Sequence, residues 1–136
     1  MLNYLGITYY DIYDVLLNIN MPAGRMDMVE YQNNRIIVDY AHTPDAVLNV
    51  ISTVKEVCEG KIYTVFGCTG DRDRTKRPIM TKIVTDLCDK AIITSDDLHN
   101  EDPKQIVNDM ISGLTNSNYI IEMDRRKAII EGINLL

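Results

Sequence analysis

The stretch from Phe66 to Pro78 carries the residues best suited to bind a charged ligand. It reads F-G-C-T-G-D-R-D-R-T-K-R-P and follows residues 62–66, an apolar run typical of a buried strand. Gly67 and Gly70 allow a tight turn and a close approach of the backbone to a ligand. The cationic side chains that follow are Arg72, Arg74, Lys76 and Arg77. A helix beginning near Pro78 would point unpaired N–H groups at the same place, so the stretch predicts an anion site, with a solvated basic loop as the alternative.

A second polar group, residues 39–44, ends one predicted strand and opens a helix; it reads D-Y-A-H-T-P. An aspartate at a strand tip, here Asp39, can accept hydrogen bonds from the two hydroxyls of a ribose. His42 can contact a phosphate, carry a proton or cap the helix, and the sequence leaves these alternatives open. Other side chains that could join these two in a metal cluster are Asp96, Asp97 and His99. No pair of them has the spacing of metal ligands, so we predict no metal site.

The elements that must position these residues alternate along the chain. Hydrophobic periodicity and turn signals predict helices at 4–19, 43–57, 78–88, 103–111 and 124–136, and strands at 26–31, 35–39, 61–66, 90–94 and 119–121. The strand at 35–39 is apolar on both faces, which is typical of a central strand. This order predicts an α/β fold with a mostly parallel sheet and helices on both faces. The loops 39–45, 67–77 and 95–102 should then gather at the carboxyl edge of the sheet.

Composition narrows the class of protein. The chain has 136 residues and a net charge of −6, which argues against nucleic-acid binding. No apolar run is long enough for a membrane span, and the first residues lack the pattern of a signal peptide. The three cysteines have no metal-ligand spacing and indicate free thiols in a reducing cytoplasm.

Several motifs together resemble the C-terminal domain of the Mur ligase family. They are Gly24-Arg25-Met26, the segment 39–45, Phe66-Gly67-Cys68, the segment 70–78 and Glu101-Asp102-Pro103. The resemblance runs in order through nearly the whole chain. It implies a Rossmann-like α/β domain of an ATP-dependent amide ligase, of the kind that adds the third amino acid to UDP-N-acetylmuramoyl-dipeptide in peptidoglycan synthesis through an acyl phosphate.

The resemblance also implies roles for single residues. Arg25 would reach the ATP phosphates, Asp39 would hold the ribose, and His42 would lie near the nucleotide as a catalytic candidate. Arg72 would pair with a carboxylate of the incoming amino acid, which suits the fork of a guanidinium group. ATP and Mg²⁺ would be bound mainly by a central domain, whose phosphate-binding motif G-x-x-x-x-G-K-[ST] this chain does not contain. Residues 1–22 would be the tail of that domain and its linker, and residues 23–136 the C-terminal domain without its last segment.

The chain departs from the family in the loop that faces the amino acid. Members that add diaminopimelate read Asp-Asn-Pro-Arg there, whereas this chain reads Asp96-Asp97-Leu98-His99. A neutral histidine offers less to a second carboxylate than an arginine, and a second aspartate favours an ammonium group. We therefore expect L-lysine or L-ornithine to be preferred over meso-diaminopimelate. The alternatives are a related ligase acting on another acid and a non-catalytic ligand-binding module.

Overall fold

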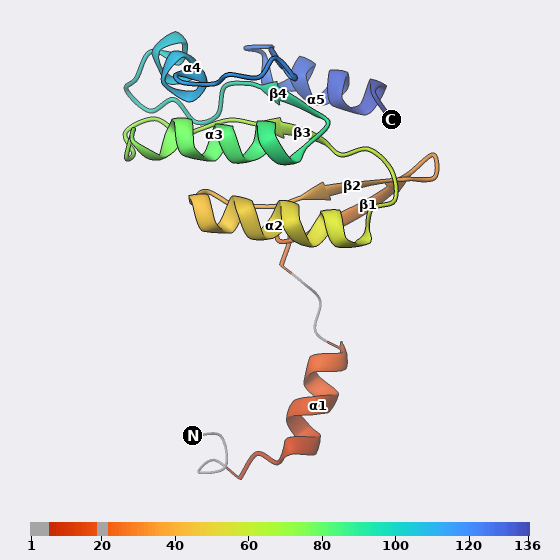
Figure 1. The fold of residues 1–136 in the computed structure, drawn as a ribbon. Coiled ribbons are helices and arrows are strands. Elements are labelled where there is room, and N and C mark those ends of the chain that lie inside the picture. Colours follow the sequence, from red (N-terminus) through yellow and green to blue (C-terminus); the bar gives the residue numbers. More distant parts are fainter. Residues whose placement is uncertain (1–5, 19–21) are drawn as a thin grey trace. The chain divides into compact units, whose positions relative to one another are not determined.

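The computed structural model describes residues 6–18 and 22–136, and its contacts divide the chain into two units, 1–40 and 41–136 (Figure 1). The first unit contains α1 (Tyr9–Asn18), β1 (Asp27–Tyr31) and β2 (Asn34–Val38). The second contains α2 (Pro44–Val57), β3 (Tyr63–Phe66), α3 (Lys76–Leu87), β4 (Lys90–Ile93), α4 (Pro103–Ile111), β5 (Tyr119–Ile121) and α5 (Arg125–Asn134). None of the helices in the described ranges combines the length and hydrophobicity that crossing a bilayer requires.

The helix of the first unit begins with a reciprocal cap. The Thr8 hydroxyl accepts from the Asp11 N–H at 3.2 Å, and the Asp11 carboxylate accepts from the Thr8 N–H at 2.7 Å. This is the capping-box arrangement, so α1 starts at Tyr9. The outer residues of the helix predicted over 4–19 (4, 5 and 19) lie outside the described residues.

The two strands of the first unit form an antiparallel hairpin. Tyr31 pairs with Asn34 across a two-residue turn, and Gln32 and Asn33 both have left-handed backbones, with φ of 47° and 65°. Such a turn matches the twist of the flanking strands. Our prediction of a central strand at 35–39 was therefore wrong: in the described residues β2 pairs only with β1.

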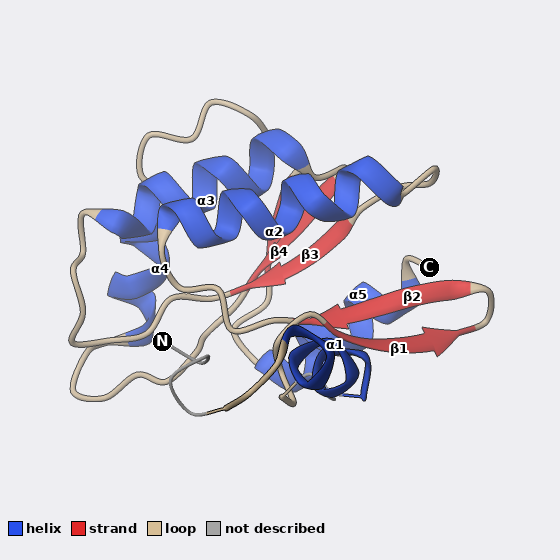
Figure 2. Cartoon of the chain, turned by 90° about the horizontal axis from the view of Figure 1, so that it is seen from below, coloured by secondary structure: helices blue, strands red, loops and turns tan. Residues whose placement is uncertain are grey.

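The second unit is built on a parallel sheet in the order β3-β4-β5. Phe66 pairs with Ile93, and Ile93 with Ile121, so the strands end together at one edge. Helices lie on both faces: α3 and α5 each contact β3 and β4, from opposite sides (Figure 2). The α/β fold with a parallel sheet between helices is thus confirmed.

Side-chain alternation divides the apolar residues of β3 and β4 between these two layers. Phe66, Ala91 and Ile93 join the main core with residues of α2, α3 and α4; its other helical members include Val47, Ile51, Met80, Val84, Ile106 and Met110. On the other face, Gly132 of α5 lies so close to Val65 that an added Cβ would meet Val65 Cγ2 at 2.9 Å. Both faces of the short sheet are therefore covered, and its carboxyl edge remains for the loops.

Candidate functional site

The carboxyl ends of β3, β4 and β5 open into loops 67–75, 94–102 and 122–124. Two of them are in direct backbone contact, because the Gly70 N–H donates to the Asp97 carbonyl at 2.8 Å. The predicted gathering of the glycine-rich loop and the 95–102 loop is therefore confirmed. The third predicted loop, 39–45, spans the boundary between the two units.

Close packing explains one glycine of the motif. A Cβ on Gly70 would fall onto the Leu98 carbonyl, 2.7 Å from its carbon. The neighbouring Asp71 has a left-handed backbone with φ of 52°, and its carboxylate accepts from the Asn100 side-chain amide at 2.8 Å. The glycine thus serves the contact between two loops.

A buried ion-pair network joins the same loops to two helices. The Arg77 side chain, at the start of α3, is 1% exposed. Its guanidinium donates twice to Glu101, at 2.7 and 3.0 Å, and once to Asp109 of α4, at 2.8 Å. The Arg77 hydrogen bonds, assisted by the Asp71 N–H and by Arg74, lower the pKa of Glu101 to about 2. Glu101 therefore remains ionised at neutral pH and fixes the loop that carries the cations.

The four cations of the motif have different environments. Arg77 is committed to Glu101 and Asp109, Arg74 lies 3.0 Å from Glu101, and Lys76 lies 3.9 Å from Asp73. Arg72 is exposed and, within residues 6–18 and 22–136, has no hydrogen bond or ion pair. Of the predicted anion-binding cations, Arg72 is the one whose fork stays available to a ligand.

One of the two carboxylates of the 96–99 loop has a cationic partner within the protein. Asp96 lies 3.8 Å from the Arg125 guanidinium, and the Asp97 carboxylate lies 3.7 Å from His99 Nε2. Arg125 also donates to the Ser95 carbonyl at 3.1 Å. Of the two carboxylates expected to be unpaired, Asp96 therefore has a guanidinium beside it.

The residues predicted to contact the nucleotide divide between the units. In the first, the Arg25 guanidinium lies 4.9 Å from the centroid of the Tyr40 ring, and Asp39 accepts from the Met26 N–H at 2.9 Å. In the second, His42 is exposed immediately before the N-cap of α2, which is Thr43. His42 is thus not the cap, which removes one of its alternatives.

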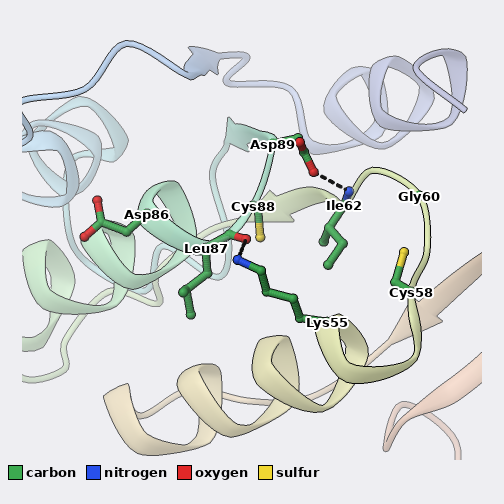
Figure 3. Close-up of a pocket in the computed structure, with 8 residues that line it drawn as sticks. All are labelled: Lys55, Cys58, Gly60, Ile62, Asp86, Leu87, Cys88 and Asp89. Atoms are coloured by element: carbon green, nitrogen blue, oxygen red, sulfur yellow. Dashed lines mark hydrogen bonds between the residues drawn. The ribbon is translucent and has the colours of Figure 1, made fainter.

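Two other features do not contribute to this site. Burial raises the pKa of the Cys68 thiol to about 12, so Cys68 is a packing residue and a poor nucleophile. A cavity of about 460 Å³ lies at the opposite, amino ends of β3 and β4 (Figure 3). Polar groups that line this cavity are hydrogen-bonded to one another. Lys55 donates to the Leu87 carbonyl at 3.4 Å, and the Ile62 N–H donates to the Asp89 carboxylate at 2.8 Å.

Sequence reasoning gave no role to Glu101 or Arg125. Glu101 belongs to one of the motifs, but its hydrogen-bond partner Arg77 is 24 residues away in the sequence. Arg125 carried a signal of its own, because a cation in the first turn of a helix opposes the helix dipole and needs another reason to be there. In the structure Arg125 contacts Ser95 and Asp96.

Comparison with known proteins identifies the family that this chain resembles. Residues 24–136 match the family model described as Mur ligase, glutamate ligase domain. The chain is 46% identical over 134 residues to a UDP-N-acetylmuramoyl-L-alanyl-D-glutamate--2,6-diaminopimelate ligase of Fusobacterium nucleatum, and 44% identical over 133 residues to a ligase of the same name from Clostridium botulinum. Each alignment covers 96% of this chain and 28% of the relative.

Solved structures of Mur ligases and related proteins have the same fold as this chain. One of a ligase with the same name has a TM-score of 0.74 and 38% identity, covering 93% of this chain and 26% of that one. A folylpolyglutamate synthase from Thermotoga maritima, with a TM-score of 0.66 and 21% identity over 95% of this chain and 30% of that one, shares the fold. The resemblance inferred from the motifs is thus confirmed.

The relatives correct one prediction. They are named as 2,6-diaminopimelate ligases, so the expected preference for L-lysine or L-ornithine was wrong. The prediction had counted Asp96 and Asp97 as two unpaired negative charges. In the structure the Arg125 guanidinium lies 3.8 Å from Asp96, so one of these two charges is offset within the protein.

Proposed function

Because the chain belongs to the Mur ligase family, whose glutamate ligase domain its residues 24–136 match, we propose that it is the amino-acid-binding part of an ATP-dependent ligase. The ligase joins 2,6-diaminopimelate to UDP-N-acetylmuramoyl-L-alanyl-D-glutamate in cytoplasmic peptidoglycan synthesis. The likeness to ligases of that name, 46% identical over 134 residues, is the observation that carries the proposal. The chain spans 28% of that relative, so the complete reaction requires parts beyond those described here.

The reaction forms one amide bond. ATP supplies a phosphoryl group that converts the glutamate carboxylate into an acyl phosphate; the amine of the incoming amino acid then displaces inorganic phosphate and loses a proton. In this scheme Arg72 holds a carboxylate of the amino acid and so directs its amine toward the acyl carbon. The exposed, uncommitted guanidinium of Arg72 supports that role, and loop 96–99 is proposed to line the same pocket through Asp96, Asp97 and His99.

The nucleotide is proposed to contact Arg25, Asp39 and His42. Asp39 already uses one carboxylate oxygen for the Met26 N–H, which fixes the side chain at the end of β2. Within residues 6–18 and 22–136, no three His, Cys, Asp or Glu side chains form a group that could hold a metal ion. We assign the metal and most of the ATP contacts to a central domain, with residues 1–22 as its tail and residues 23–136 as part of the C-terminal domain.

A chimeric ligase tests the proposal. This chain replaces the matching segment of the Clostridium botulinum relative, and product formation is measured with ATP, UDP-N-acetylmuramoyl-L-alanyl-D-glutamate and either 2,6-diaminopimelate or L-lysine. We expect turnover that depends on 2,6-diaminopimelate. In parallel, NMR titration of the chain with the free amino acid should shift the amide signals of residues 70–74. Turnover only with L-lysine, or neither turnover nor shifts, would contradict the proposal.

A further inference from the structure

Glu101 receives an unusual number of contacts for one carboxylate on a loop. Its side chain is 7% exposed and accepts two hydrogen bonds from Arg77, while Arg74 lies 3.0 Å away. It also accepts the backbone N–H of Asp71 at 2.6 Å. All these partners belong to the 71–77 segment, so one side chain of the second loop fixes the first loop at both ends.

Each of the two loops contains a non-glycine residue with a left-handed backbone: Asp71 in the first, at φ of 52°, and His99 in the second, at φ of 46°. Such conformations persist only where surrounding contacts impose them, and they gather at ligand sites. At Asp71 the imposing contacts are its N–H to Glu101 and its carboxylate to Asn100.

Arg72 follows Asp71 directly and is the uncommitted cation of the loop. The direction in which its side chain leaves the backbone is therefore set one residue earlier, where Glu101 and Asn100 hold Asp71. The second loop is joined to the first at Asp97 as well, because the Asp97 carbonyl accepts the Gly70 N–H at 2.8 Å. Both loops assigned to the amino acid thus depend on the position of Glu101.

Stability alone is a weak reason for this network. Burying Arg77 costs desolvation energy, and replacing a buried ion pair by apolar residues is often neutral or stabilising. The Arg77 Nε has no partner among the described residues, so its burial is not even fully compensated. A requirement for geometry accounts for the network better.

We propose that Glu101, held by Arg77, is the positioning residue that sets Arg72 and loop 96–99 for the incoming amino acid. The inference rests on the proposed function, in that Arg72 is assigned to the carboxylate of that substrate. Glu101 does not touch the reacting atoms. It acts through the backbone of Asp71 and through the hydrogen bonds that join the two loops. Its removal should weaken recognition of the amino acid and spare the use of ATP.

The first test measures the loops themselves. Amide hydrogen exchange is compared in the chain and in its Glu101→Gln and Arg77→Lys variants. Both variants should speed exchange at Gly70 and Asp71 by about tenfold or more, while amides of β4 keep their rates. The matched control is Asp86→Asn, which removes a carboxylate that pairs with Lys82 at 2.6 Å near the other end of α3. Unchanged exchange at Gly70 and Asp71 in the two network variants overturns the inference.

The second test uses the chimeric ligase. Glu101→Gln should raise the KM for 2,6-diaminopimelate by about tenfold and leave the KM for ATP within about twofold. A core variant, Val84→Ala, controls for general loss of stability and should not change that ratio. Equal rises in both KM values, or a fall in kcat alone, would overturn the inference. A wild-type chimera that is inactive, with a chain that does not bind 2,6-diaminopimelate, would instead contradict the proposed function.

Discussion

At the scale of single residues, equal charges along one loop have unequal roles. Arg77 is enclosed by two carboxylates, Arg74 shares one of them, and Arg72 remains exposed. The free energy of a charged hydrogen bond is available to a ligand only where no internal partner already uses it. We therefore expect loss of the Arg72 side chain to weaken binding of the substrate.

Replacing Arg72 tests its proposed contact with the amino acid. In the chimeric ligase, Arg72→Ala should raise the KM for 2,6-diaminopimelate by about 30-fold, which corresponds to about 2 kcal/mol for a lost charge-assisted hydrogen bond. Arg72→Lys should recover part of this, since it restores the charge but not the two parallel donors. Lys76→Ala is the matched control, because Lys76 is half-exposed and lies 3.9 Å from Asp73. Similar KM values for the Arg72→Ala and Lys76→Ala variants would remove Arg72 from the site.

The lowered pKa of Glu101 predicts how stability depends on pH. Its ordinary value is 4.5 and its value in the folded chain is about 2. A depressed folded pKa contributes stability above the unfolded value, and this is lost as pH falls through the folded one. The difference in Tm between the wild type and Glu101→Gln should thus be constant above about pH 5 and shrink between about pH 4.5 and 2. Thermal unfolding followed by circular dichroism measures it; a difference that stays constant down to about pH 2 would show that the ion pair does not form.

At the scale of elements, the site depends on how two βα loops pack. Parallel strands bring the ends of β3 and β4 to one edge, but side chains and glycines decide how closely the loops approach there. Gly70 is the point of closest approach, against the Leu98 carbonyl. The Arg77–Glu101 network then joins these loops to α3 and α4, so loops and helices form one packed unit.

A side chain at Gly70 should separate the loops. Gly70→Ala places a methyl group against the Leu98 carbonyl, and we expect a loss of about 2–4 kcal/mol in the free energy of unfolding, measured with urea. Gly60→Ala is the control, because a Cβ there meets nothing within 4 Å and the backbone is not left-handed. The free energy of unfolding of that variant should lie within about 1 kcal/mol of the wild-type value, and any change should be stabilising. Equal effects of the two substitutions would contradict the close approach.

At the scale of the whole molecule, we expect folding and catalysis to be separable. The second unit has its own core on both faces of its sheet, formed largely by residues between Val47 and Ala128. The chain covers 28% of its Fusobacterium nucleatum relative, and its sequence contains no P-loop. A domain of this size can fold alone, whereas the proposed function requires another part of the ligase to supply the phosphate cradle.

The purified chain should therefore fold without being active. We expect a cooperative unfolding transition, but neither ATP hydrolysis nor amide formation above a blank. A phosphate-release assay with and without UDP-N-acetylmuramoyl-L-alanyl-D-glutamate and 2,6-diaminopimelate measures this, with the chimeric ligase as the positive control. Turnover by the chain alone that depends on these substrates would refute its assignment as one part of a larger ligase.

The sequence by itself determined the parts that depend on local order. The apolar run at 62–66, the glycines after it and the alternation with helical segments predicted a parallel sheet with helices on both faces and a ligand edge at its strand ends. The motifs were sufficient to identify the family. These features persist because strand and helix periodicity, turn residues and short connections act between neighbours in the chain.

Only the tertiary structure decided which polar groups are available. Arg77 and Glu101 are 24 residues apart, and Arg125 lies 29 residues after Asp96, yet each pair is in contact. The sequence shows that these charges exist but not the distances between them, and electrostatic energy depends on distance and burial. For this reason neither the cationic partner of Asp96 nor the network around Glu101 could be inferred before the loops were packed together.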